Sequence, residues 1–588
     1  MTPDLHQRIR AAHRKVADAL LAELSPAGHW VGELSSSALS TATAVTALAT
    51  VGRTGDADHV RKGLEWLAAH ANPDGGWGDT VRSRSNLSTT ALAWAAFGAA
   101  GADETFASTV TNTARYISEK AGAIERLVPA IEALYGKDRT FSVPITMTLA
   151  LSGRLGPDGW REVRPLPFEL AALPRGLFGA LRLPVVSYAL PALIAIGQVI
   201  HQRSGRFHPL RSFTRERTLD VLTTLQPANG GFLEATPLTS FVTMSLAGMG
   251  LAEHPVAQRG AAFLRQSVRP DGSWPIDTNL ATWGTTLAIK ALRHTCETLA
   301  DGQRATLRAW LLGQQYRAVH PYTGAAPGGW AWTDLPGGVP DADDTAGALL
   351  ALRCLSEPDD ETRAAAARGV KWLLDLQNRD GGMPTFCRGW GALPFDRSTP
   401  ELTAHALRAW AAWLSELPSE LAARIQSARS RATAYLRTAQ RPDGAWLPLW
   451  FGNEAAPRQE NPVYGTAQVL LGTASERALA AARDRGRTFV VAQQNEDGGW
   501  GGARDTPSTM EETALSLEAL TDGPEHQAAI DAGTRWLLQA VEAGAWHAPA
   551  PIGLYFARLW YFERLYPLVF TTSAFGQLAS IVCQAASG

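Results

Sequence analysis

The 588-residue chain is predicted to be all-α, with two α/α barrels built from repeated helical hairpins. One observation is a recurring motif, in which an aromatic-bearing helix and often a Gln lead into a glycine-rich turn that ends on an aromatic residue. Between the copies, Ala/Leu-rich segments such as Ala91–Phe97 and Thr285–Leu292 have the periodicity of helices. A composition of 45% hydrophobic residues, with 20 Trp and 54 Gly, excludes a disordered chain.

The repeats follow one another through the whole sequence. A weak copy, Pro26–Trp30, comes first, and later copies close at Asp74–Trp77, Asn229–Phe232, Asp271–Trp274, Asp380–Met383, Asp443–Trp446, Asp497–Trp500 and, degenerately, Gly544–Trp546. In the later part of the chain, their spacing of roughly 50 residues fits one helical hairpin per copy. Gly provides the positive φ that a reversal of the chain needs, and Asp or Asn caps the next element. We expect these residues to build the architecture rather than to catalyse.

The repeats also suggest the domain boundaries. We expect residues 1–29 to form an N-terminal helix that packs on the second barrel, residues 30–280 to form the first barrel and residues 281–588 the second. An apolar, aromatic stretch from Tyr555 to Pro567 follows the last repeat. Such a stretch is typical of a plug or lining rather than of a polar solenoid cap, which favours closed barrels.

Charge and cysteine content exclude several classes of protein. A net charge of −2 without a Lys/Arg-rich run removes the electrostatic basis of nucleic-acid binding. The four cysteines form no C-x-x-C pair, and the polar start lacks the apolar core of a secretory signal, so we expect a cytoplasmic protein. The uncharged segment Leu183–Ile200 contains Pro184 and Pro191, which disfavour a membrane span. It is expected to be a buried hairpin or a surface that dips into one leaflet.

The densest acidic cluster is Asp341, Asp343 and Asp344, immediately before the apolar run Gly347–Leu352. Helix capping and the helix dipole explain one or two carboxylates there. Three carboxylates this close repel one another, so at least one retains its proton if the cluster is desolvated. A retained proton can serve a general acid, and aromatic faces nearby can stabilise a carbocation without trapping it.

These motifs, in this order, resemble the squalene-hopene cyclases and related class II terpene cyclases over nearly the whole chain. The repeats look like the Gln-Trp repeats of that family, and Asp341–Ala346 is similar to its D-x-D-D-T-A motif. Gly328–Trp332, Thr403–His405 and the aromatic stretch ending at Pro567 are similar too.

The resemblance implies a role for each matching residue. Asp343 is the expected proton donor, Asp341 and Asp344 are its supporting carboxylates, and His405 is the hydrogen-bond partner that orients and acidifies the donor. The expected substrate-binding residues are Trp283, Trp332, Phe386, Cys387, Trp450, Tyr555 and Phe562. Of these, Phe386 and Cys387 match a gate on the substrate channel, and Tyr555 and Phe562 fall in the stretch that closes its far end.

The implied reaction converts a linear isoprenoid, foremost squalene or a similar polyene, into a polycyclic product without a metal or other cofactor. The alternative is a class II diterpene or sesquiterpene cyclase that retains the diphosphate of its substrate, held by Mg²⁺ and by Arg388 or Arg397. Peripheral or monotopic membrane contact is expected through residues 166–200. A monomer and a homodimer both stay open.

Other protein classes fit less well. A protein prenyltransferase β-subunit shares the barrel but needs a zinc site of Asp, Cys and His, and the sequence has no D-x-C. A barrel glycosidase needs two separated carboxylates in a polar cleft. A non-catalytic helical scaffold would leave the acidic cluster without a purpose.

Overall fold

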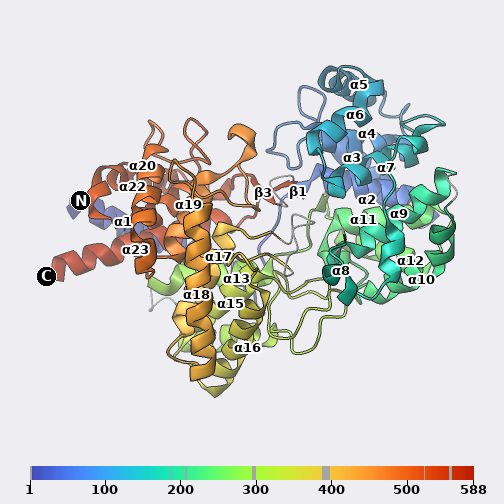
Figure 1. Cartoon of the computed structure of the whole chain (residues 1–588). Coiled ribbons are helices and arrows are strands. Elements are labelled where there is room, and N and C mark those ends of the chain that lie inside the picture. The colour runs from blue at the N-terminus through green and yellow to red at the C-terminus, as the bar shows by residue number, and fades with distance from the viewer. Residues whose placement is uncertain are drawn as a thin grey trace.

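The computed structural model describes residues 3–183, 185, 187–205, 208–294, 299–386, 397–521, 523–554 and 559–587. Figure 1 shows helices gathered in two groups, one from α2 to α12 and the other from α13 to α23 together with α1. Each group is a ring of inner helices surrounded by outer helices. The predicted all-α class with two α/α barrels is confirmed.

The inner ring of the first barrel closes where α11 packs against α2. Inner helices are almost fully buried, and they are rich in Ala, Leu and Thr, whose small or hydroxyl-bearing side chains allow close packing. The inner helices are α2 (Ala38–Val51), α4 (Leu87–Ala99), α7 (Arg139–Leu151), α9 (Leu190–Arg203) and α11 (Thr236–Gly248). Outside them lie α3 (Ala57–Ala69), α5 (Ala107–Ala121), α6 (Leu127–Tyr135), α10 (Pro209–Leu225) and α12 (Pro255–Ser267).

The second barrel closes where α23 packs against α13. Its inner helices are α13 (Ala281–Ala291), α15 (Ala342–Leu355), α17 (Pro400–Trp413), α19 (Pro462–Gly472), α21 (Met510–Leu520) and α23 (Tyr566–Ser587). The outer helices are α14 (Asp301–Gly313), α16 (Asp360–Leu376), α18 (Ser419–Ala439), α20 (Ala480–Ala492) and α22 (Gln527–Glu542). The N-terminal helix α1 (Pro3–Ala22) packs on α22 and α23 and so completes the outer layer of this barrel.

The repeat motif fastens each hairpin to the next through hydrogen bonds. The Trp77 indole N–H donates to the Leu67 carbonyl ten residues earlier, at 2.9 Å. The Gln377 amide donates to the Gly381 carbonyl at 2.8 Å and to the Ala428 carbonyl of the next outer helix at 3.0 Å. The same ten-residue indole bond recurs at Trp30, Trp274, Trp446 and Trp500. Buried backbone carbonyls at the turns thereby receive donors, which explains why the motif recurs in hairpins that face no ligand.

Two short strand pairs lie between the barrels. Strand β1 (Ser36–Ser37) pairs antiparallel with β2 (Trp274–Pro275), and β3 (Ile552–Leu554) pairs antiparallel with β4 (Leu559–Tyr561). The backbone N–H of Trp560 donates to the Asp79 carboxylate of the first barrel at 2.8 Å, and Leu34 pairs with Glu563. The described part of the aromatic stretch, residues 559–567, is therefore held at the junction of the two domains.

The apolar segment Leu183–Ile200 belongs mainly to the core of the first barrel. Helix α9 is an inner helix, and its residues from Leu193 to Ile200 are buried. Among the helices that the structure describes, none is both long and apolar enough to cross a membrane. A surface role for residues 166–200 is therefore restricted to the part before α9.

Candidate active site

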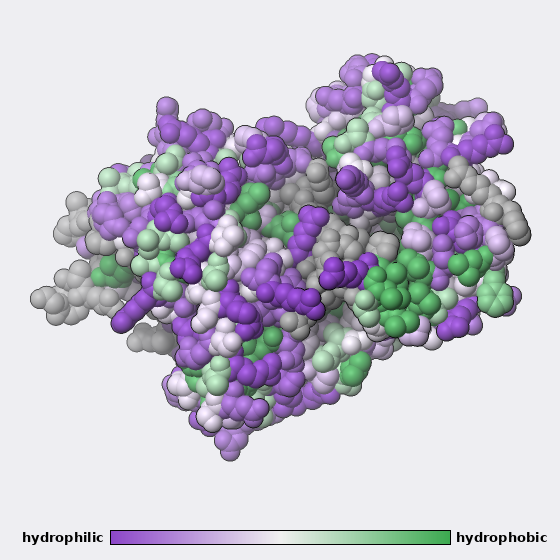
Figure 2. Space-filling view, in the orientation of Figure 1, coloured by the Kyte–Doolittle hydropathy of each residue, from purple (hydrophilic) through white to green (hydrophobic). Residues whose placement is uncertain are grey.

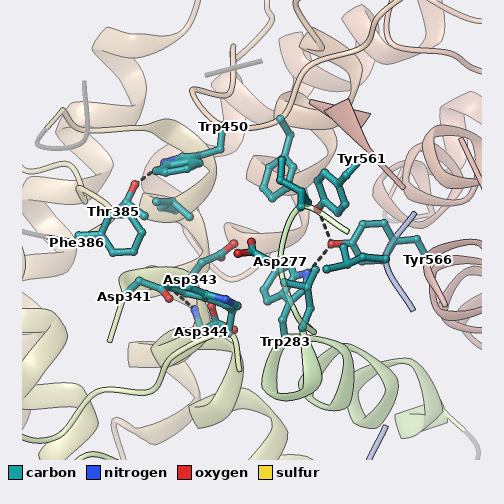
Figure 3. A pocket seen from close by; sticks show the side chains of 16 residues that line it. Asp277, Trp283, Asp341, Asp343, Asp344, Thr385, Phe386, Trp450, Tyr561 and Tyr566 are labelled. Carbon is teal, nitrogen blue, oxygen red and sulfur yellow. Dashed lines mark hydrogen bonds between the residues drawn. The ribbon is translucent and has the colours of Figure 1, made fainter. Parts of the chain in front are cut away.

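A cavity lies at the N-terminal ends of α13, α15 and α17, facing the first barrel (Figure 3). Aromatic residues form much of its wall: Trp283, Trp332, Phe386, Trp450, Tyr561 and Tyr566. Four carboxyl groups also line it: Asp277, Asp341, Asp343 and Asp344. The cavity thus joins an acidic cluster to an aromatic wall.

Asp341 and Asp344 are neighbours at the start of α15. Asp341 is the N-cap residue, and its carboxylate accepts a hydrogen bond from the Asp344 backbone N–H at 2.8 Å. Burial raises the pKa of Asp341 to about 7, and burial followed by the nearby Asp341 carboxylate raises the pKa of Asp344 well above its ordinary value. Asp344 therefore holds its proton at neutral pH while Asp341 is about half ionised, which limits the negative charge of the pair beside the cavity.

Asp343 points from α15 into the cavity, and His405 of α17 holds it from behind. The distance between His405 Nδ1 and Asp343 Oδ1 is 2.6 Å. On the other side of the imidazole ring, Lys290 Nζ of α13 lies 3.3 Å from His405 Nε2. Burial and, next, the Lys290 ammonium lower the pKa of His405, so the neutral imidazole is favoured.

The aromatic wall is fixed by hydrogen bonds and ring contacts. The Trp283 indole N–H donates to the Tyr566 hydroxyl at 3.0 Å, and the Tyr561 and Tyr566 hydroxyl groups are 2.7 Å apart. Phe386 meets Trp332 and Trp450 edge-on, with ring centroids 6.2 Å and 5.8 Å away. Rings held in this way present fixed electron-rich surfaces to the cavity, and such surfaces attract positive charge.

The comparison of the whole chain with protein families decides its identity. The C-terminal domain of squalene-hopene cyclases matches residues 280–580, and their N-terminal domain matches residues 14–229. The chain belongs to the squalene-hopene cyclase family. Curated relatives of the chain are named squalene-hopene cyclases and other terpene cyclases.

Relatives of the chain differ in what their names say they make. A squalene hopane cyclase of Aspergillus fumigatus is 25% identical over 83% of this chain and 78% of its own length. A drimenyl diphosphate synthase of Streptomyces showdoensis is 34% identical over 31% of each chain. In several other curated relatives the match spans only 24% to 47% of their length. The ent-copalyl diphosphate synthase structure from Streptomyces platensis shares the fold, with a TM-score of 0.59, 19% identity, and coverage of 97% of this chain and 99% of that one.

Most of the site residues predicted from the sequence lie together at this cavity. Trp283, Trp332, Phe386 and Trp450 line it with the three aspartates of the acidic motif, and His405 stands behind Asp343. Phe562 lies elsewhere, with the Arg82 guanidinium 5.1 Å from its ring centroid. Neighbouring side chains in an extended segment point to opposite sides, so Tyr561 faces the cavity and Phe562 does not. Cys387, Arg388 and Tyr555 lie outside the described residues, and Arg397 is exposed.

Four further residues belong to the same region of the cyclase: Asp277, Lys290, Tyr561 and Tyr566. Lys290 could have been recognised from the sequence, because it is the one charged residue of the otherwise apolar helix α13. The two tyrosines lie in the aromatic stretch that the sequence indicated, at positions it did not resolve. Asp277 follows the closing Trp274 of a repeat, and no sequence pattern distinguishes it from the other turn aspartates.

Asp277 is a buried carboxyl on the first-barrel side of the cavity. In Figure 3 the Asp277 and Asp343 carboxyl groups both point toward the middle of the cavity. Burial, followed by the neighbouring Glu234, raises the pKa of Asp277 to about 8. Its Oδ1 atom has no hydrogen-bond partner among the residues that the structure describes. At neutral pH this side chain is mostly a neutral acid.

The raised pKa of Asp277 predicts a pH-dependent cost to folding. Folded Asp277 keeps a proton that the unfolded chain has lost between about pH 4 and about pH 8, so its contribution to stability falls as the pH rises through this range. We expect Asp277→Asn to unfold like the wild type near pH 4 and to become increasingly more stable than it toward pH 8. Urea unfolding across this range measures the difference. A stability difference that does not change with pH would contradict the assignment, and Asp360→Asn, on the exposed surface of α16, is the control.

Proposed function

We propose that Asp343 is the proton donor of a cascade that cyclises a linear isoprenoid. The observation that carries this proposal is the 2.6 Å contact of His405 Nδ1 with Asp343 Oδ1. The carboxyl group of Asp343 also lines the aromatic cavity. A hydrogen bond donated to one carboxyl oxygen leaves the acid proton on the other oxygen and makes it easier to release. The terminal alkene or epoxide of the substrate would accept that proton.

The surroundings of Asp343 suit a carbocation. Aromatic faces of Trp283, Trp332 and Trp450 attract positive charge but are poor nucleophiles. Asp341 and Asp344, when protonated, are much weaker nucleophiles than free carboxylates and do not trap the cation. Exclusion of water by the mostly apolar wall keeps the cation from premature quenching. No step of this chemistry calls for a cofactor, and we propose that none is needed for a hydrocarbon substrate.

A second, apolar cavity favours a long substrate such as squalene. This cavity lies in the first barrel and shares Ile276 and Phe386 with the catalytic cavity. Its wall includes Leu92, Ala192, Leu233 and Phe241. A polyene that begins at Asp343 could continue past Phe386 into this space, where hydrophobic burial holds it folded.

A prenyl diphosphate is the alternative substrate class. The partial likeness to a drimenyl diphosphate synthase favours it, because that relative is named for a diphosphate product. In this case the hydrocarbon part would occupy the catalytic cavity, and Mg²⁺ with Arg388 or Arg397 would hold the diphosphate. Asp341 and Asp344 are buried and have raised pKa values, which makes them poor Mg²⁺ ligands, so the metal would bind with the diphosphate instead.

We also propose that the cyclase contacts a lipid surface through an apolar patch, defined here as Leu173, Leu177, Leu181, Leu210 and Phe213. The patch spans the segment around α8 (Gly176–Ala180) and the start of α10, and Phe213 is 86% exposed. Figure 2 shows a hydrophobic area where Figure 1 places α8. Arg175, which lies between Leu173 and Leu177 of the patch, donates a hydrogen bond to the Pro321 carbonyl. Close to Pro321 is a pocket that is lined by Thr323 and by Phe386. Lipid contact there would deliver an apolar substrate beside the cavity.

Loss of the proton donor should abolish cyclisation. Asp343→Asn keeps the shape of the side chain but has no acidic proton, so we expect product formation to fall by at least about a thousandfold. Purified protein is incubated with squalene and with geranylgeranyl diphosphate, each with and without Mg²⁺, and products are analysed by mass spectrometry. Wild-type rates in Asp343→Asn would refute the mechanism, and turnover of the diphosphate alone would refute the squalene assignment. Asp360→Asn on the surface is the matched control.

Filling the second cavity should disfavour a long substrate. Ala192 of α9 lines this cavity, so Ala192→Trp removes room for the distal part of squalene. We expect squalene turnover to drop at least about tenfold, with shorter or incompletely cyclised products. Leu134→Trp adds the same ring on the exposed surface of α6 and should leave turnover unchanged. Unaltered squalene kinetics in folded Ala192→Trp would show that the substrate does not use this space.

Removal of exposed apolar side chains should weaken lipid binding. We expect Leu177→Ser with Phe213→Ser to weaken binding to phosphatidylcholine/phosphatidylglycerol vesicles at least about tenfold, as measured by co-sedimentation, because burial of each side chain in the lipid interface contributes about 1.5–3 kcal/mol. Val81→Ser, which changes an exposed residue away from the patch, is the control. Equal sedimentation of both variants would contradict membrane contact through the patch.

A further inference from the structure

Lys290 is a charged residue in an otherwise apolar setting. It is the one charge of α13, whose remaining residues are apolar or carry hydroxyl groups. Its ammonium lies 3.3 Å from His405 Nε2 and 5.7 Å from the centroid of the Trp283 ring. Burial of a cation costs folding free energy unless its contacts compensate for the lost hydration. The contact of Lys290 with His405, the partner of the proposed proton donor, therefore needs an explanation.

The contact determines where the imidazole proton resides. A lysine ammonium has three N–H donors and no acceptor, so His405 Nε2 has to accept its hydrogen bond. A neutral imidazole carries one proton, which is then on Nδ1. The Nδ1 atom faces Asp343 Oδ1 at 2.6 Å, so the N–H group donates to that oxygen.

We propose that Lys290 is a positioning residue that fixes His405 as the Nδ1–H tautomer and thereby keeps the acid proton of Asp343 on its cavity-facing oxygen. This inference rests on the proposed role of Asp343 as proton donor. Without Lys290, His405 could carry its proton on Nε2 and accept the Asp343 proton at Nδ1. The acid proton would then point away from the substrate.

Lys290 also opposes transfer of the acid proton to His405. An imidazolium would place two positive charges 3.3 Å apart at the Lys290–His405 contact. The pair of a protonated Asp343 and a neutral His405 avoids this repulsion. Burial, and next the Arg408 guanidinium, lower the pKa of Lys290 to about 8, so the side chain is still mostly a cation at neutral pH.

Packing of three neighbouring inner helices brings the three groups together. Lys290 comes from α13, Asp343 from α15 and His405 from α17, and α15 packs against both of the others. Gly347 of α15 provides the room: a Cβ atom there would lie 3.0 Å from Thr286 Oγ1 of α13 and 3.7 Å from His405 Cε1. The close approach at Gly347 lets the contact between α13 and α17 form beside the proton donor.

Three substitutions separate the possible roles of Lys290. Lys290→Met removes donor and charge but keeps an unbranched side chain, Lys290→Gln keeps a neutral donor, and Lys290→Arg keeps both donor and charge. We expect Lys290→Met to lose at least about tenfold in kcat with little change in KM, because binding of the hydrocarbon does not involve this residue. Lys290→Gln and Lys290→Arg should recover most of this loss. A kcat of Lys290→Met within twofold of the wild type, or no recovery by either donor-bearing variant, would overturn the proposal.

The tautomer can be observed directly in the unmodified protein. Nitrogen-15 NMR of histidine-labelled enzyme distinguishes protonated from unprotonated ring nitrogens, and the His405→Asn spectrum identifies the signals of His405. We expect a protonated Nδ1 and an unprotonated Nε2 in the wild type, and a mixture of tautomers in Lys290→Met. A wild-type Nε2–H tautomer or an imidazolium would overturn the inference even if a variant failed to fold. This readout needs no substrate, so it remains decisive if the proposed reaction of Asp343 proves wrong, whereas inactivity of the wild type on every isoprenoid would count against the reaction alone.

Discussion

The exclusion of water from a small group of carboxyl groups is the constraint on which the architecture depends. In water the proton of a carboxylic acid goes to solvent, and an alkene cannot compete for it. Burial at the start of α15 raises the pKa values of Asp341 and Asp344, while Asp343 lines an aromatic cavity. Two barrels that face each other supply this dry space, since neither one alone surrounds both sides of the cavity.

The repeats serve that constraint indirectly. Indole and amide side chains satisfy the backbone carbonyls of the turns, as Trp77 and Gln377 illustrate. The inner helices can then be rich in small residues and pack closely enough for side chains of α13, α15 and α17 to meet. A cavity wall made from the ends of rigid helices holds its groups in place better than loops would.

The fold and the acidic cluster were predictable because they depend on local patterns. Turn glycines with closing aromatics and the Asp341–Asp344 motif are contiguous in sequence. Groups brought in from distant segments were harder to predict. Asp277 looks like any turn aspartate, and the role of Lys290 depends on a contact 115 residues along the chain. In the aromatic stretch, the inward residue is Tyr561 rather than Phe562, because the alternation of a short strand depends on its pairing and not on composition.

The position of α1 has a consequence for how the protein assembles during synthesis. This helix is translated before both barrels, yet its partners α22 and α23 are translated after the rest of them. Its amphipathic face has to remain without its native neighbours while the whole first barrel and most of the second are translated. Closure of the second barrel is therefore a late, long-range event, and during that interval the exposed face of α1 is a natural target for chaperones.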